Sequence, residues 1–519
     1  MAAILLTNAR IYTMDDDQPV VNSLLIQDGV IQAQGLHDPS AEILDLHGAA
    51  VLPGLIDAHI HLDHFAQSLE MVELEGYSLE ACLERIRSKA QELPPGSWIL
   101  GHGWNQNNWD DGYPDASILD QISTQHPIYL TAKSLHAAWV NSKALELAGI
   151  KQHTPDPPDG KFKRDYAGSP SGILFEGAMT LVSHRIPEPS VEQTAELIAQ
   201  AQEKLWSMGI TGVHDFDRSR CFSALQHLNG QNRLYLRVVK SLPVDLLDQA
   251  IEIGLRSGFG DDWLRIGSVK AFADGALGPR TAAMLQPYEG ETENVGILLL
   301  DQETLVDIGL RAASNGLSIA VHAIGDRANH ELLNAMEQVR NAETRHKLGH
   351  LRHRIEHVQI LHPADKNRLA RQNIIASMQP IHAISDMTMA DRYWGQRSAG
   401  AYAWRDQIDA GARVIFGSDA PVDSPNPFWG LHAAVARRKV DEKEGWYPEQ
   451  RLSLQEALTC YTVNPAYAAG QERMQGKLIE GYFADLIVLP ADPFEIAVDE
   501  LYHLQPEKTM VGGRWVFTA

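Results

Sequence analysis

The stretch Val51-Leu-Pro-Gly-Leu-Ile-Asp-Ala-His-Ile-His-Leu62 decides how the rest of the chain is interpreted. It begins with apolar residues around Pro-Gly and ends with two histidines that are two positions apart. Because successive side chains of a β-strand point to opposite faces, His59 and His61 would share one face, and their apolar neighbours the other. Such a strand is typical of half a metal site, although a histidine pair at this spacing also occurs by chance.

The composition is that of an ordinary globular protein. Of the 519 residues, 44% are hydrophobic and 21% are charged, which allows a large core and more than one domain. The net charge of 44 − 67 = −23 argues against nucleic acid or an anionic membrane as a partner. No apolar run approaches the roughly 20 residues that cross a bilayer, and the chain does not start like a signal peptide.

The cysteines carry no pattern of their own. Cys82, Cys221 and Cys460 are far apart, odd in number and outside any CxxC motif. A disulfide framework or a cysteine zinc site is therefore not expected. We expect a cytoplasmic protein that works in a reducing compartment.

Apolar strand-like runs alternate with helix-like stretches along most of the chain, which predicts βα units around a parallel sheet. Eight such runs occur, the number that a closed (β/α)8 TIM-like barrel needs. They are residues 56–61, 128–132, 210–216, 264–272, 317–322, 353–358, 373–379 and 414–418. The second assignment is open, because residues 98–101 compete with residues 128–132.

The two chain ends are expected to form one further domain. Short strand-like segments predict a small β-sandwich domain from residues 1–53 and 471–519, with the barrel at residues 54–470. About 150 residues separate the first run from Ile210, more than one βα unit needs. We therefore expect an insertion or lid at about residues 65–190. Four tryptophans of this region would either wall an apolar substrate pocket or belong to a core: Trp98, Trp104, Trp109 and Trp139.

Polar side chains stand where several predicted strands end, which is where a parallel barrel collects catalytic groups. They are His59, His61, Lys270, His322, His357 and Asp419. Each alone has a structural explanation, as a hydrogen-bonding histidine, an ion-paired lysine or a turn aspartate. The complete set in this order is improbable by chance, and imidazole suits Zn²⁺ and related ions.

This ordered set resembles the metal-dependent amidohydrolase superfamily in its two-metal form. In that family the ligands are an HxH pair after strand one, a lysine after strand four, histidines after strands five and six, and an aspartate after strand eight. Finer motifs resemble the amidohydrolase 3 branch, which includes N-substituted formamide deformylases. They include Gly101-His-Gly-Trp104, His136-Ala-Ala-Trp-Val-Asn141 and Gly417-Ser-Asp-Ala-Pro421. The resemblance covers most of the chain.

The resemblance implies two divalent metal ions, with Zn²⁺ expected, and a CO₂-derived carbamate on Lys270. A lysine ammonium has only donors and a positive charge, so it cannot ligate a metal without that modification. The implied reaction is hydrolysis of an amide or N-substituted formamide C–N bond by a metal-bound hydroxide, with Asp419 moving the proton. His136 is a second catalytic candidate, as a hydrogen-bond partner of a substrate oxygen, with a structural role as the alternative.

Three other functions stay open at this point: a cyclic amidine deaminase, a lactone or phosphoester hydrolase, and a non-catalytic binding or regulatory protein. The expected partner is a small-molecule amide substrate, without nucleic acid or membrane, and further copies of the chain remain an open alternative. His214, at the end of the expected third barrel strand, and His382, near the mouth at strand seven, are further candidates for the site.

Overall fold

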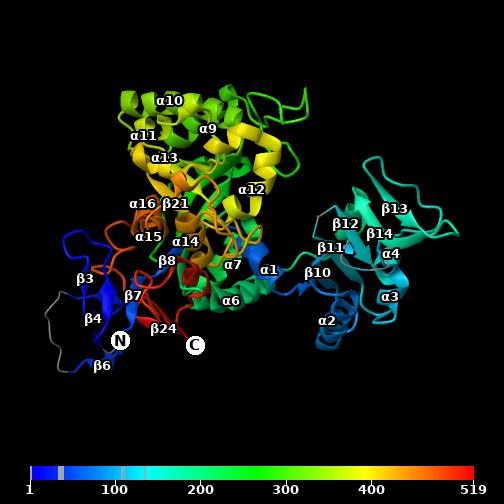
Figure 1. The fold of residues 1–519 in the computed structure, drawn as a ribbon, viewed down its shortest axis with the longest axis horizontal. Helices are drawn as coiled ribbons and strands as arrows, with labels where there is room; N and C mark the ends of the chain where they lie inside the picture. The colour runs from blue at the N-terminus through cyan, green and yellow to red at the C-terminus, as the bar shows by residue number, and fades with distance from the viewer. Residues whose placement is uncertain (1–2, 33–39, 107–108, 110–111, 134–135) are drawn as a thin grey trace. The chain divides into compact units, whose positions relative to one another are not determined.

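The computed structural model describes residues 3–32, 40–106, 109, 112–133 and 136–519. The chain forms two compact units, residues 1–66 with 191–519 and residues 67–190. The first unit carries three β-sheets and the second carries one (Figure 1). No helix in the described ranges is long and apolar enough to cross a membrane.

Eight parallel strands form the centre of the first unit (Figure 1), and their order in the sheet follows their order in the chain. They are β8 (Leu55–Ile60), β15 (Ile210–Asp215), β16 (Arg237–Pro243), β17 (Leu264–Phe272), β18 (Ile319–Ala323), β19 (Arg354–His357), β20 (Ile375–Met378) and β21 (Val414–Phe416). The ring closes where Asp419 N donates to His59 O at 2.7 Å and His61 N donates to Ala420 O at 2.9 Å. We call this junction of β8 with the segment after β21 the seam. The predicted (β/α)8 barrel is confirmed.

Helices connect the strands and cover the outside of the barrel (Figure 1). They are α1 (Leu62–Ser68), α6 (Val191–Ser207), α7 (Ser219–Gly230), α8 (Leu247–Glu252), α9 (Gln302–Ser314), α10 (Asp326–His346), α11 (Arg368–Gln372), α12 (Pro380–Trp394), α13 (Trp404–Asp409), α14 (Pro427–Ala436), α15 (Leu454–Tyr461) and α16 (Val463–Ala468). Helix α6 shows why they pack. Its buried residues Ile198, Ala201 and Leu205 recur at helical spacing and face one core cluster. Helix α15 begins with a capping box between Ser453 and Glu456.

The assignment of the second barrel strand is wrong. Residues 128–132 form β11 (Ile128–Ala132) and the competing segment forms β10 (Ile99–Trp104), and both belong to the sheet of the second unit. The missing barrel strand is β16, which carries two charged residues. Lys240 is buried against Asp215 with an Nζ–Oδ2 distance of 2.7 Å. Strand β15 is therefore the second barrel strand and not the third.

Both chain ends contribute to two further sheets of the first unit. The four-stranded sheet has the order β5 (Val30–Ile31), β4 (Leu24–Gln27), β1 (Ile4–Thr7), β6 (Glu42–Asp45). The six-stranded sheet has the order β24 (Arg514–Thr518), β23 (Lys508–Val511), β22 (Leu486–Leu489), β7 (Ala50–Pro53), β2 (Arg10–Tyr12), β3 (Val20–Val21). The sheets share one apolar core, with Leu6 and Leu24 from one and Val51 and Leu486 from the other. Strand β7 leads directly into β8, so this β domain anchors the start of the barrel.

The second unit is the expected insertion after the first barrel strand. Its sheet has the order β13 (Gly160–Arg164), β14 (Pro170–Glu176), β12 (Ala137–Val140), β11, β10, β9 (Val72–Glu73). Its helices are α2 (Leu79–Glu92), α3 (Ala116–Asp120), α4 (Ser142–Leu147) and α5 (Ala178–Ser183). Trp104, Trp109 and Trp139 pack on one another with ring centroids 5.7 to 6.4 Å apart in its core. Of the two expectations for these tryptophans, the core is correct.

Candidate metal centre

The six side chains predicted from the sequence lie together at the carboxyl ends of the barrel strands. They are His59 of β8, His61 just after β8, Lys270 of β17, His322 of β18, His357 of β19 and Asp419 just after β21. The Nε2 atoms of His59 and His61 each lie 3.4 Å from Asp419 Oδ1. The ring centroid of His357 lies 5.0 Å from that of His59 and 4.5 Å from that of His322.

Lys270 joins the cluster through an aromatic neighbour. The ring centroid of Phe216 lies 4.2 Å from that of His59 and 4.7 Å from Lys270 Nζ. Lys270 Nζ also lies 4.9 Å from the ring centroid of Phe272. The ammonium group is thus buried between aromatic rings and the imidazoles of the cluster.

Each histidine has one ring nitrogen held by an acceptor outside the cluster. His59 Nδ1 lies 2.6 Å from Glu356 Oε2, and His61 Nδ1 lies 3.1 Å from Asp217 Oδ1. His357 Nδ1 pairs with Gln379 Oε1 at 2.9 Å, and His322 Nε2 pairs with Gly275 O at 2.9 Å. When the held nitrogen carries the proton, the other nitrogen presents a lone pair, which is the arrangement that metal-binding histidines use.

Electrostatics keep three of these imidazoles neutral. Burial, aided by the nearby Lys270, lowers the pKa of His59 to about 4 and the pKa of His322 to about 4. Burial and the neighbouring His322 hold the pKa of His357 well below its ordinary value. A neutral imidazole is the form that binds a metal ion, so burial prepares these three side chains for that role.

Three buried histidine and lysine nitrogen atoms at the cluster have no hydrogen-bond partner among the described residues, and one of them is His382 Nε2, which lies 4.0 Å from Asp419 Oδ2. The other two are His59 Nε2 and Lys270 Nζ, and these residues are 1% and 4% exposed. An unpaired polar group inside a protein is costly, so such atoms point to a missing ligand. Burial also lowers the pKa of Lys270 to about 8. The donor set therefore fits divalent cations.

Asp419 stands at the centre of the cluster in a strained backbone conformation. Its φ is 61° and that of His357 is 76°, values that residues other than glycine rarely adopt. Burial alone would raise the pKa of Asp419, but His59, His61 and His357 together hold it well below its usual range. The carboxylate is ionised at neutral pH, and strain of this kind is concentrated at functional sites.

The remaining candidates separate into three places. His382, at the start of α12, lies with its Nε2 atom 4.0 Å from Asp419 Oδ2 and 3.8 Å from Asp423 Oδ2. His214 does not join the cluster, since its Nδ1 accepts from Arg354 at 2.8 Å and its side chain lines a cavity at the amino ends of the strands. His136 belongs to the inserted unit, where its Nδ1 lies 3.0 Å from Glu176 Oε1.

The residues that orient the histidines were missed from the sequence. Glu356 precedes a ligand candidate in the chain, and Asp217 follows β15 by two positions. Each lies within or beside a strand-end motif. The sequence does not show, however, whether an acidic residue at such a position is exposed to solvent or accepts a hydrogen bond from a histidine. Both carboxylates are buried, and the pKa of Glu356 lies well below its ordinary value because Arg354 and His59 outweigh the effect of burial.

Comparisons with known proteins agree with this geometry. The model of the amidohydrolase family matches residues 42–517. YtcJ of Bacillus subtilis (strain 168), itself provisionally named an amidohydrolase, is 32% identical over 98% of both chains. The N-substituted formamide deformylase of Arthrobacter pascens is 29% identical over 99% of this chain and 98% of its own. The crystal structure of an uncharacterised metal-dependent hydrolase from Pyrococcus furiosus superposes with a TM-score of 0.78 at 31% identity, covering 95% of this chain and 100% of that one.

The barrel, its histidine cluster and these likenesses together define a metal-dependent hydrolase that uses a divalent ion. Because the matching family model spans all but the ends of the sequence, the chain belongs to the amidohydrolase family.

Proposed function

We propose that this hydrolase holds two divalent ions of the zinc class and cleaves the C–N bond of an amide, most suitably an N-substituted formamide. The observation that carries the proposal is the pair of buried, unpartnered atoms His59 Nε2 and Lys270 Nζ, in a cluster whose aspartate, Asp419, is ionised and lies 3.4 Å from His59 Nε2. The ligands would be the six residues of the cluster. Bound ions would supply an acidic water molecule and polarise the scissile carbonyl.

Lys270 would serve as a carbamate. A buried amine with a pKa of about 8 is neutral in roughly a tenth of the molecules at pH 7, far more than an ordinary lysine, and only the neutral amine reacts with CO₂. The product is an anion with two oxygens, which replaces a cation among the imidazoles. Lys270 is 4% exposed, so little water reaches this group.

Asp419 would move the proton. Its Oδ1 atom lies between two imidazoles and its Oδ2 atom faces His382, so an attacking water and a leaving amine can both be reached from one carboxylate. The group would accept a proton at the start of the reaction and deliver it to the amine nitrogen at the end. The strained backbone at Asp419 fixes the direction of this carboxylate.

The amide substrate is supported by the relative from Arthrobacter pascens, whose name specifies N-substituted formamides.

His136 remains our proposed contact for a substrate oxygen. Replacement of His136 by alanine should raise KM or lower kcat without changing the metal content. His126 of the same unit, which is buried and bonded to Ser97 O, is the matched control for replacement by alanine. Equal effects of the two changes would favour a structural role for His136.

We also propose a cytoplasmic location, which is supported by three buried cysteines that form no disulfide.

The decisive test combines metal analysis with intact mass measured under native, non-acidic conditions. We expect two divalent ions per chain and a mass excess of one CO₂. Lys270→Ala should lose the mass excess and at least one ion. The control is Lys89→Ala, which removes a lysine of α2 that pairs with Glu70 in the inserted unit, and it should keep the mass excess and both ions. One ion without the excess would direct the search to deaminase-like chemistry.

A substrate screen then separates the amide proposal from its competitors. N-substituted formamides and N-acyl amines should be turned over by the metal-loaded protein and not by Asp419→Asn. Turnover of lactones or phosphoesters, with none of amides, would overturn the proposed substrate class while leaving the metal centre intact.

A further inference from the structure

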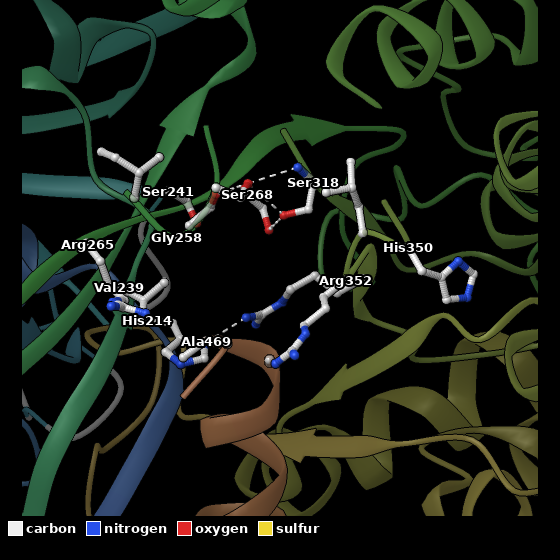
Figure 2. Close-up of a pocket in the computed structure, with 17 residues that line it drawn as sticks. His214, Val239, Ser241, Gly258, Arg265, Ser268, Ser318, His350, Arg352 and Ala469 are labelled. Atoms are coloured by element: carbon white, nitrogen blue, oxygen red, sulfur yellow. Dashed lines mark hydrogen bonds between the residues drawn. The ribbon is translucent and has the colours of Figure 1, made fainter. Parts of the chain in front are cut away.

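A second cavity of about 370 Å³ opens at the amino ends of the barrel strands (Figure 2). Several of its wall residues precede or begin the strands, such as Ser318 before β18, Arg352 before β19 and Arg265 near the start of β17. Ser241 of β16 and His214 of β15 reach the cavity from further along their strands. The six residues of the metal centre occupy or follow the later halves of their strands. None of these six residues lines the cavity, so it is distinct from the catalytic site and opens towards the other end of the barrel.

One wall of this cavity is made of serine hydroxyl groups. Ser318 Oγ lies 2.9 Å from Ser268 Oγ and 3.1 Å from Ser257 Oγ, and Ser257 donates to Gly267 O at 2.6 Å. Ser241 is 3% exposed, and its hydroxyl has no hydrogen-bond partner among the residues that the structure describes. A hydroxyl that borders a cavity and has no protein partner is free to donate to a ligand there.

The opposite wall carries positive charge. Figure 2 shows Ser268 and Ser318 on one side of the cavity and Arg352 with His214 across from them. Three arginines line the cavity, namely Arg265, Arg352 and Arg354, whereas no Asp or Glu of the described chain does. Glu472 and Glu356 balance the charges of Arg352 and Arg354, whereas Arg265 makes no ion pair among the described residues. In a protein with a net charge of −23, an unbalanced guanidinium group at a cavity favours an anion.

Only one of the three arginines is uncommitted. Arg352 is held by both oxygens of Glu472 at 2.7 Å, and Arg354 is held by Glu356, so these two are fixed in place. Arg265 donates from Nε to Asp261 O at 3.3 Å. Within the described ranges its two terminal nitrogens have no hydrogen-bond partner, and such a planar pair of donors matches a carboxylate or a phosphate.

We propose that this cavity binds a small oxyanion, a group with the chemistry of a carboxylate or a phosphate, through Arg265 and the Ser241 hydroxyl. The site would also have a connection to the catalytic end of the barrel. Arg354 borders the cavity and donates to Glu356, which in turn holds His59 Nδ1. An anion against Arg354 would therefore touch the chain of hydrogen bonds that orients a metal ligand.

Calorimetric titration of the full-length, metal-loaded protein tests the proposal, with inorganic phosphate and acetate as probes at constant ionic strength. We expect one saturable site per chain for at least one probe. Arg265→Gln should weaken it by about tenfold or more and Ser241→Ala by about fivefold. Arg87→Gln, at an exposed position on α2 of the inserted unit, should leave it unchanged. Preference for one probe identifies whether the natural ligand carries phosphate or carboxylate.

Two results would overturn the proposal. One is the absence of saturable binding by either probe at millimolar concentration. The other is binding that survives both substitutions, which places the anion at the metal ions or elsewhere. Far-UV circular dichroism and a thermal scan establish that the variants are folded. Ser241→Ala decides the question alone if Arg265→Gln does not fold.

Discussion

Each imidazole of the metal centre depends on a second residue for its orientation, and Glu356 is the most deeply buried of these partners. It is 0% exposed, and its two oxygens connect His59 Nδ1 with Arg354. The carboxylate fixes the protonated nitrogen of His59 and turns the other nitrogen inward. Residues in this position usually matter nearly as much as the ligands themselves.

Glu356→Gln should therefore lower the affinity for metal by about 10- to 100-fold without unfolding the barrel. Competition with a chromophoric chelator measures the affinity. Glu343→Gln is the matched control, because Glu343 Oε1 holds another buried imidazole, His353, at 2.9 Å, outside the metal centre. Equal losses of affinity in the two variants would contradict the role given to Glu356.

Metal binding should depend on pH through His61. Burial lowers the pKa of His61, but hydrogen bonds to Asp217 and Asp419 outweigh burial and raise it to about 9. At neutral pH the metal must displace a proton from this imidazole, and formation of the carbamate releases a further proton from Lys270, whose pKa is about 8. The affinity should therefore rise by at least tenfold per pH unit up to pH 9. Above pH 9 both protons are already lost and the rise should end.

Asp217→Asn provides the control for this pH dependence. Without the charge at position 217, the pKa of His61 should return towards its ordinary value near 6.5. The affinity should then stop rising at a lower pH than in the unmodified protein. Identical pH profiles for the two proteins, from isothermal titration between pH 6 and 9.5, would refute the assignment to His61.

At the seam, β8 and the segment after β21 approach each other very closely. Asp57 of β8 accepts hydrogen bonds from Ser418 N and His59 N, both at 3.0 Å. A Cβ atom on Gly417 would lie 2.4 Å from His59 N and 2.8 Å from Asp57 Oδ1. Only glycine allows the two strand ends to approach so closely.

Gly417→Ala should push the seam apart, abolish metal binding at the usual concentrations and lower the thermal midpoint. Gly230→Ala is the control, since nothing lies within 4 Å of a Cβ atom at this last residue of α7 and its φ is not positive. That substitution should be neutral or stabilising by up to about 1 kcal/mol. Metal titration and thermal unfolding of both variants decide the matter, and normal metal binding by Gly417→Ala would count against the close contact.

The elements also mark how far sequence reasoning reaches. The barrel and its six strand-end side chains were predictable, because apolar runs of strand length each end on a polar residue. Strand β16 escaped prediction because Arg237 and Lys240 interrupt its apolar pattern, and only the folded chain supplies their partners, Asp485 and Asp215. We assigned β11 to the barrel from the sequence because a short apolar run has the same pattern in the barrel as in the sheet of the inserted unit. Glu356 and Asp217 were invisible for a related reason, since their partners come from other strands.

At the scale of the whole molecule, two units with separate cores share one chain. The clusters around Trp104 and Phe162 consist entirely of residues from the inserted unit, and the barrel clusters contain none of them. Units with independent cores can unfold as separate cooperative transitions.

Differential scanning calorimetry should therefore resolve two transitions, of which only one responds to metal removal. If metal binds only the native barrel, it should raise the free energy of unfolding by about 4 kcal/mol when the free metal concentration is roughly 1,000 times the dissociation constant. Chelation should lower the transition of the barrel and leave that of the inserted unit in place. A single transition that moves as a whole would indicate that the two units unfold together.

The seam joins positions far apart in the chain, since Asp57 and Ser418 are separated by 361 residues. An ion shared by His59, His61 and Asp419 would act there as a reversible cross-link, comparable to a bond that closes a very long loop. Such a link has to break before the ends of the barrel can separate, but it forms only after they have met. Metal should thus slow unfolding strongly and leave the rate of refolding almost unchanged, which stopped-flow fluorescence with and without chelator can measure. The same ion that performs the chemistry would then also set the lifetime of the native barrel.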